Sequence, residues 1–371
     1  MIHLNTAGAG LPAPAVFPAM TEYLAAEAEL GPYEAEERYA AALTGDVYEA
    51  LAALVGADPT EVALFGSATD AWCRVVCNLR LPRGSRVWVT PYEYAGNLAA
   101  LRLLCDRFDA RLEVVPTLPG GDLDLDRMAA RLDERVALVS VPHMPSGCGT
   151  VLPVERVGAL LAGSAAVYVV DACQTVGQVP VNVAAIGADL VTAAGRKFLC
   201  GPRGSGFAVV ARRIWDRVEP PFHDLHVAEI DPTGKATVTV DTAAMFETAE
   251  RNNAVVVGLS AAARHARTAP DIDPDVFPAL LDAVRETPGV RLHAPGSRQS
   301  GIVAFSHETL APQAIRAGLG AAGINGWVGT GSHTPIYYAA EGVSRFVRLS
   351  VHHYNDLGQV AAVRRVLADI T

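Results

Sequence analysis

The sequence predicts an α/β protein with a mostly parallel, doubly wound sheet and a smaller C-terminal α+β domain. Short β-branched runs alternate with helical segments between residues 62 and about 210, as in parallel sheets with crossover helices. The 371 residues exceed what one small core needs, and half of them are apolar, so two domains can each form a core. We expect residues 13–243 to form the large domain and residues 1–12 and 244–371 the smaller one.

The N-terminal part of the chain is expected to be a loop followed by two helices. Residues 5–12 are small and turn-prone, which lets the backbone approach another group closely. Residues 14–30 and 34–55 are rich in Ala and Glu, and Gly31-Pro32-Tyr33 separates them. The first strand of the sheet should follow these helices.

Each predicted strand of the large sheet is a short, mostly apolar run bounded by turn residues. The runs are residues 62–65, 86–89, 112–115, 136–140, 167–170, 189–192 and 207–210. Helices are expected after the first run, ending near residue 79, and at 125–132. Later, we expect an irregular segment at 220–240, near a site entrance or a subunit interface, a strand at 346–350 and a final helix at 356–370.

Charge and hydropathy argue against two classes of partner. The net charge is −10 without a run of like charge, whereas nucleic-acid backbones are held by clustered Lys and Arg. No stretch approaches the ~20 apolar residues that span a bilayer. Residues 1–5 lack the basic segment and apolar run of a signal peptide, so we expect a cytoplasmic protein with reduced thiols.

The cysteines do not predict a metal site. Cys73 and Cys77 lie four positions apart on an expected helix, a spacing that a metal pair could use. No second pair or nearby histidine accompanies them, so we expect buried, apolar thiols and no metal.

The stretch from Val167 to Gly206 places an acid and a base after two strands. Asp171 follows the run at 167–170, and Lys197 follows the run at 189–192. Because ligands bind at the carboxyl ends of such strands, the two side chains can meet in one site. Pyridoxal phosphate (PLP) needs this pair: a lysine amine for a Schiff base and a carboxylate at its ring nitrogen. The alternative is a turn Asp and a surface Lys.

Three motifs carry a resemblance to a known family. They are Asp171-Ala172-Cys173-Gln174, Ala194-Gly195-Arg196-Lys197 and Gly201-Pro202-Arg203-Gly204. With them the sequence resembles the class V aminotransferase family, which includes cysteine desulfurases, isopenicillin N epimerase-like proteins and C–S lyases. The resemblance spans nearly the whole chain and implies a fold type I PLP enzyme that works as a homodimer.

The resemblance also implies roles for single residues. Lys197 would hold PLP and then act as the base for the Cα proton of the substrate, while Asp171 would bind the ring nitrogen. Asn5 and Arg348 would bind the substrate, Arg348 by a fork to its α-carboxylate. The other contacts to the cofactor would come from Ala68, Thr69, Tyr94, Ser146, Gln174 and Arg196.

Several of these residues have ordinary alternatives. Residues 5–12 also fit an N-terminal arm, Thr69 sits in a turn of the kind that precedes many helices, and Tyr94 could belong to a core. His143 is a possible acid or base, but we expect a hydrogen-bonded structural histidine.

The chain departs from the family pattern at four places. It keeps Glu93 and Asn97, but Tyr94 stands where cysteine desulfurases carry a histidine, so stacking is kept and that histidine's acid–base role is lost. Arg196 replaces a common phosphate-binding histidine. Ala249-Glu250 replaces a Gly-Thr pair that contacts the partner subunit's phosphate, and Glu250 is expected to act otherwise, for example in a pair with Arg251. Residues 329–335 lack the persulfide-forming cysteine of the desulfurases.

We therefore expect a PLP-dependent C–S lyase. β-Elimination from an S-substituted cysteine, or its sulfoxide, would give a thiol or sulfenate, pyruvate and ammonia, as in sulfur natural-product biosynthesis. The alternative within the family is a decarboxylating deaminase, aminotransferase or epimerase acting on a related amino-acid conjugate. A fold that binds its ligand without turnover is the non-enzyme alternative, and the joint presence of Lys197, Asp171 and Arg348 argues against it.

Overall fold

A seven-stranded sheet forms the centre of the computed structural model, which describes residues 1–219, 222–270 and 272–370. Its strands are β2 (Val62–Phe65), β3 (Arg86–Val89), β4 (Arg111–Val114), β5 (Val136–Pro142), β6 (Val167–Asp171), β7 (Leu190–Ala194) and β8 (Gly206–Val210). They lie in the order β2-β8-β7-β6-β5-β3-β4. β8 runs antiparallel to β2 and β7, and the other neighbours run parallel. The expected mostly parallel sheet is confirmed.

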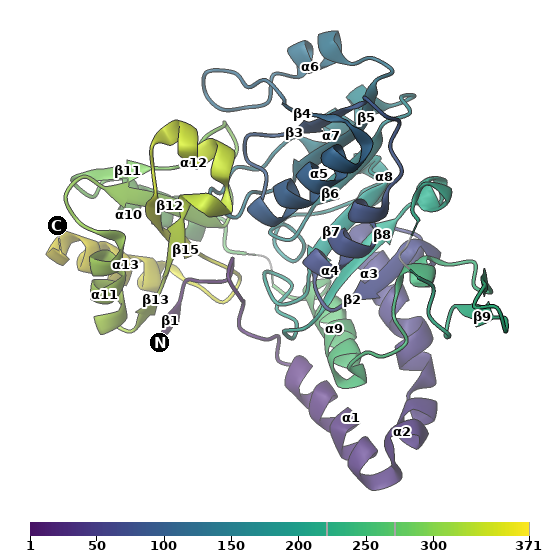
Figure 1. The fold of residues 1–371 in the computed structure, drawn as a ribbon. Coiled ribbons are helices and arrows are strands. Elements are labelled where there is room, and N and C mark those ends of the chain that lie inside the picture. Colours follow the sequence, from purple (N-terminus) through teal and green to yellow (C-terminus); the bar gives the residue numbers. More distant parts are fainter. Residues whose placement is uncertain (220–221, 271, 371) are drawn as a thin grey trace.

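Helices cover this sheet, and a group of them extends below it in Figure 1. They are α1 (Val16–Leu30), α2 (Pro32–Arg38), α3 (Val47–Val55), α4 (Ala68–Arg74), α5 (Ala95–Phe108), α6 (Leu125–Arg131), α7 (Val154–Leu161), α8 (Val183–Ile186) and α9 (Asn253–Ala266). The prediction of a single helix at 34–55 is wrong, because a turn and a π-helical segment, Ala42–Asp46, separate α2 from α3. Thr44 donates a hydrogen bond of 2.8 Å to the Ala40 carbonyl, a side-chain contact that bends helices.

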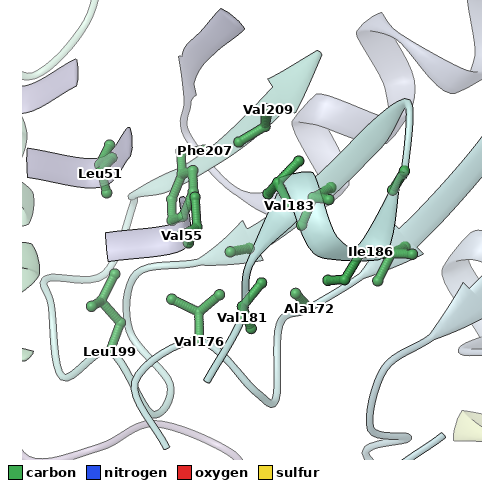
Figure 2. Close-up of a cluster of buried hydrophobic side chains, with 14 of the residues drawn as sticks. Leu51, Val55, Ala172, Val176, Val181, Val183, Ile186, Leu199, Phe207 and Val209 are labelled. Atoms are coloured by element: carbon green, nitrogen blue, oxygen red, sulfur yellow. The ribbon is translucent and has the colours of Figure 1, made fainter. Parts of the chain in front are cut away.

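The segments that follow β6 and β7 are anchored in one apolar cluster. Figure 2 shows Ala172 and Val176, which follow Asp171, near Leu199, which follows Lys197. Leu51 and Val55 of α3 belong to the same cluster. Burial of one such Leu or Val side chain contributes roughly 1.5–3 kcal/mol, so the core restrains both polar segments.

A second, four-stranded antiparallel sheet lies beside the first (Figure 1). Its strands, in the order β11-β12-β15-β14, are β11 (Val290–Leu292), β12 (Ile302–His307), β15 (Arg345–Ser350) and β14 (Trp327–Thr330). Its helices are α10 (Val276–Arg285), α11 (Pro312–Ala321), α12 (Pro335–Glu341) and α13 (Leu357–Ile370). At the N-terminus, β1 (Ile2–His3) pairs in parallel with β13 (Ile324–Asn325).

The domain boundaries at residues 13 and 243 stay a prediction. α9 packs against α1 and α3 and buries Val256 and Leu259 in the core of the large sheet.

The segment expected to be irregular at 220–240 contains a hairpin of β9 (Ala228–Ile230) and β10 (Ala236–Val238). Residues 220 and 221 lie outside the described residues, and the expected place at an entrance or interface stays a prediction. In the described part of the chain, no helix combines the length and apolarity needed to cross a bilayer.

Candidate active site

A cavity of about 180 Å³ lies at the carboxyl ends of β5, β6 and β7. Asp171, the last residue of β6, and Lys197, just beyond β7, both line it. Every residue expected to contact the cofactor lines the same cavity: Ala68, Thr69, Tyr94, Ser146, Asp171, Gln174, Arg196 and Lys197. Parallel strands end at one edge of a sheet, which brings these distant parts of the sequence together.

The Asp171 carboxylate is fixed at both oxygens. Its Oδ2 accepts a hydrogen bond of 2.8 Å from the Asn97 side-chain amide, and its Oδ1 accepts one of 2.9 Å from the Cys173 backbone. Asp171 is only 9% exposed. A buried carboxylate held in this way can face a protonated ring nitrogen without reorienting.

The Lys197 amine lies in an environment that disfavours its charge. Burial lowers the pKa of Lys197, and the neighbouring cations Arg196 and Arg348 lower it further, while Asp171 acts in the opposite direction. A neutral amine is the form that attacks a carbonyl carbon and accepts a proton. The electrostatics therefore suit the role expected of Lys197.

Two neighbours hold the Lys197 segment in place. The Gly10 backbone donates to the Arg196 carbonyl at 2.8 Å, and the Arg196 guanidinium donates in return to the Gly8 carbonyl. From the small sheet, the buried His352 contacts the Phe198 carbonyl through Nε2 at 2.6 Å. No role could be predicted for His352, because only the folded chain brings it next to the residue that follows Lys197.

The turn between β2 and α4 forms another wall of the cavity, with Ala68 and Thr69. Ser67 caps α4 by accepting a hydrogen bond of 3.1 Å from the Asp70 backbone. A Cβ at Gly206 of β8 would lie 2.6 Å from the Ser67 carbonyl carbon, so only glycine lets β8 pass this turn. The glycine-rich loop after Lys197 thereby keeps the turn close to the lysine.

Arg348 reaches toward the site from β15 of the small sheet. Its Nη1 donates a hydrogen bond of 2.9 Å to the carbonyl of Ser146, which lines the cavity, and its Nη2 lies 3.5 Å from the Asn5 Oδ1. The guanidinium carbon is 4.3 Å from the centre of the Trp327 ring. Arg348 and Asn5 lie next to each other, beside the cavity rather than in its lining, and their role in substrate binding stays a prediction.

Arg348 is a buried cation without a matching anion. It is 5% exposed, and burial lowers its pKa to about 10. Across the described residues it forms no ion pair with a carboxylate, and its Nε has no hydrogen-bond partner. An unpaired buried charge is costly, so an anionic ligand is the expected partner.

The residues at the cavity fit PLP. Lys197 offers an amine, Asp171 a fixed carboxylate, and Tyr94, 37% exposed, an aromatic ring at the cavity wall. Gln174 donates to the Ala7 carbonyl at 3.2 Å, and its buried Oε1 has no partner among the residues that the structure describes. That oxygen is free to accept a hydrogen bond from a bound ligand.

Several expectations about single residues need correction. Glu250 does not pair with Arg251, which instead forms an ion pair of 2.9 Å with the buried Glu247. Neither cysteine of the expected buried pair is buried: Cys73 is exposed and Cys77 is half-buried. For residues 1–219, 222–270 and 272–370, no group of three or more His, Cys, Asp and Glu side chains could hold a metal.

His143 is buried, and of Cys148 and Cys173 only one reaches the cavity. Burial lowers the pKa of His143 to about 4. Its Nδ1 has no partner in the described part of the chain, so the expected hydrogen bond is not made at that nitrogen. Cys173 lines the cavity, and Cys148 does not.

Known proteins resemble this chain in sequence and in fold. The sequence is 29% identical over 333 residues to a probable cysteine desulfurase of Methanothermobacter thermautotrophicus, covering 87% of this chain and 82% of that protein. It is 26% identical over 331 residues to a probable cysteine desulfurase of Pyrococcus abyssi, covering 86% and 81%.

Two solved structures show the same fold over 99% of this chain. A cysteine desulfurase from Thermococcus onnurineus NA1 gives a TM-score of 0.89 at 24% identity, with 94% of its chain covered. The cystine C–S lyase C-DES, solved with its product cysteine persulfide, gives 0.84 at 20% identity, with 97% covered. These neighbours confirm the expected fold type I architecture.

The match to the family itself covers nearly the whole sequence. The description Aminotransferase class-V fits residues 2–363 and includes both the Lys197 segment and Arg348. The chain therefore belongs to the aminotransferase class-V family, whose cofactor is pyridoxal 5′-phosphate.

Proposed function

We propose that this protein is a PLP-dependent C–S lyase that cleaves an S-substituted cysteine, or its sulfoxide, by β-elimination. The observation that carries the proposal is the unpaired, buried Arg348 beside the lysine cavity. An α-carboxylate fits this guanidinium and fills its missing ion pair. The substrate is therefore an α-amino acid, held with its Cα near the Lys197 amine.

The residues of the chain divide the work between binding and proton transfer. When bound, PLP supplies a ring that withdraws electrons from the Cα of the substrate. Asp171 holds positive charge at the ring nitrogen, and Arg348 fixes the carboxylate. Lys197 Nζ takes the Cα proton, which its lowered pKa permits once the amine is free. Loss of the sulfur group from Cβ then completes the elimination.

The fate of the sulfur follows from the thiols near the site. Residues 329–335 contain the short helix Gly331–His333 and no cysteine. Cys173 does line the cavity, but burial and the Asp171 charge raise the pKa of its thiol well above the usual range. Because thiolates rather than thiols attack sulfur, neither region offers an acceptor. We infer that the sulfur leaves as a free thiol or sulfenate.

Cysteine desulfurase activity is the second candidate, since the relatives at 26–29% identity carry that name. The named substrate of C-DES, cystine, supports the lyase instead. The two reactions differ in their carbon products. Transfer of sulfur to a protein thiol leaves alanine, whereas β-elimination with water leaves pyruvate and ammonia.

The test incubates the PLP-loaded protein with S-methyl cysteine and, separately, with cysteine. Pyruvate, ammonia and free thiol in equal amounts support the lyase. Alanine from cysteine, with no pyruvate from either compound, identifies a desulfurase. An aldehyde, or an unchanged carbon skeleton, contradicts elimination and favours the deaminase, aminotransferase or epimerase.

Three finer expectations stay predictions. They are the homodimer, a cytoplasmic location and a place in sulfur natural-product biosynthesis. Sedimentation equilibrium of the purified protein tests the first.

A further inference from the structure

Glu93 is a fully buried carboxylate directly before the Tyr94 wall of the cavity. Its Oε1 accepts hydrogen bonds of 3.0 Å from the Tyr94 backbone and from the Asn97 side-chain amide. Its Oε2 accepts one of 2.8 Å from the Ser140 hydroxyl of β5. Three donors from two elements therefore hold Glu93 in one orientation.

Asn97 connects this carboxylate to the one expected at the ring nitrogen. The same Nδ2 that donates to Glu93 also donates to the Asp171 Oδ2, at 2.8 Å. The two hydrogens of one amide thus serve two acids. Because Glu93 Oε1 accepts from this amide, Asn97 presents its NH₂ group, and not its oxygen, to Asp171.

Charge balance around the pair points to the cofactor. The pKa of Glu93 is raised to about 7: burial and the Asp171 charge raise it, and the hydrogen bonds from Ser140, Asn97 and Tyr94 act against this rise. No cation in the described ranges forms an ion pair with Glu93. Asp171 would bind the protonated ring nitrogen of PLP, a cation that both acids would stabilise.

We propose that Glu93 is a positioning residue for PLP: through Asn97 it fixes the Asp171 carboxylate at the ring nitrogen, and it supplies a second negative charge behind it. The hydrogen bond from the Tyr94 backbone to Glu93 also fixes the position of Tyr94 at the cavity wall. The inference rests on the cofactor alone and holds whichever reaction the enzyme catalyses.

Glu93→Gln tests the charge while keeping the shape. The Gln oxygen can still accept from Tyr94 and Asn97, and its amide can donate to the Ser140 hydroxyl. The readout is a pH titration of the visible absorption band of the PLP-bound protein, without substrate. Removal of a negative charge makes protonated, cationic PLP less stable. The pH at the midpoint of this titration should therefore fall by about half a unit, which is a roughly threefold loss of proton affinity of the bound PLP.

Glu247→Gln is the matched control, because Glu247 is also buried and its pKa is also raised to about 7. It contacts Tyr48, Leu64 and Arg251 rather than Asn97. Its midpoint should equal that of the wild type. An unchanged midpoint in folded Glu93→Gln, or an equal shift in both variants, overturns the proposal.

If Glu93→Gln does not fold, Ser140→Ala tests the same role of Glu93. It removes one donor to Glu93, so that its ionised form is less favoured. The midpoint should then fall in the same direction, by a smaller amount. A wild-type midpoint in this variant overturns the proposal.

Discussion

Arg348 of the small sheet donates a hydrogen bond of 2.9 Å to the carbonyl of Ser146, a residue that lines the cavity of the large sheet. The contact sets the guanidinium beside the Lys197 amine, close enough for its charge to lower the pKa of the lysine. The residues that we propose for substrate binding and for proton transfer therefore come from both sheets.

Replacement of Arg348 should weaken substrate binding without lowering the stability of the fold. Arg348→Lys keeps a cation but loses the planar fork that matches a carboxylate. We expect a loss of about 3 kcal/mol of transition-state binding, which is roughly 150-fold in kcat/KM. Steady-state kinetics with an S-alkyl cysteine measure it.

Arg345→Lys is the control, because Arg345 lies on the same strand and is exposed. It should leave kcat/KM unchanged. Arg348→Met should also leave the melting temperature unchanged or raised, because an unpaired buried charge is removed. A large fall in melting temperature would assign Arg348 to the fold instead of the substrate.

Tyr94 should act through its ring and not its hydroxyl. Tyr94→Phe keeps the aromatic face and should bind PLP as the wild type does. Tyr94→Ala removes the face, at a cost of about 1 kcal/mol, or roughly fivefold in the Kd of PLP. Fluorescence titration of the apoprotein measures both. Equal weakening in the two variants would contradict stacking.

The protein should carry no extra sulfur after turnover. The pKa of the Cys173 thiol is raised well above its usual range by burial, so its nucleophilic form is scarce. Intact-protein mass spectrometry after reaction with cysteine should give the unmodified mass. A persulfide mapped to Cys173 would show that the sulfur is transferred and not released.

Glu247 should make stability depend on pH. Burial raises the pKa of this carboxyl to about 7 in the folded chain, above its value in the unfolded chain. Its contribution to stability is therefore present at low pH and is lost as the pH rises through about 7. The stability of the wild type minus that of Glu247→Gln should fall between about pH 5 and pH 8, measured by urea unfolding. A difference that grows with pH contradicts the raised pKa.

The strands could be predicted from the sequence because short, β-branched apolar runs bounded by turn residues are typical of buried strands. β6 differs from its expected range only by including Asp171. The direction of β8 could not be predicted from its residues alone. The loop between β7 and β8 contains no crossover helix, and so the chain returns antiparallel.

The cofactor residues were predicted by motif, but the contacts that hold them were not. Asn97, in the helix after β3, lies far from Asp171 in the sequence. Only the meeting of the carboxyl ends of β3 and β6 at one edge of the sheet, with β5 between them, brings their side chains within 2.8 Å. Similarly, Glu250 is next to Arg251 in sequence, yet Glu247 takes that arginine because Tyr48 and the Leu64 backbone fix its carboxylate. Neighbours in sequence on an irregular segment need not face each other.

The most direct measurement of the central claim is the absorption spectrum of the protein after incubation with PLP and gel filtration. With Lys197 and Asp171 on one cavity, the wild type should be yellow, and borohydride should bleach the visible band and leave the cofactor covalently attached to Lys197. Lys197→Ala should lose that covalent label. A colourless wild type, or a label on another lysine, would contradict the account.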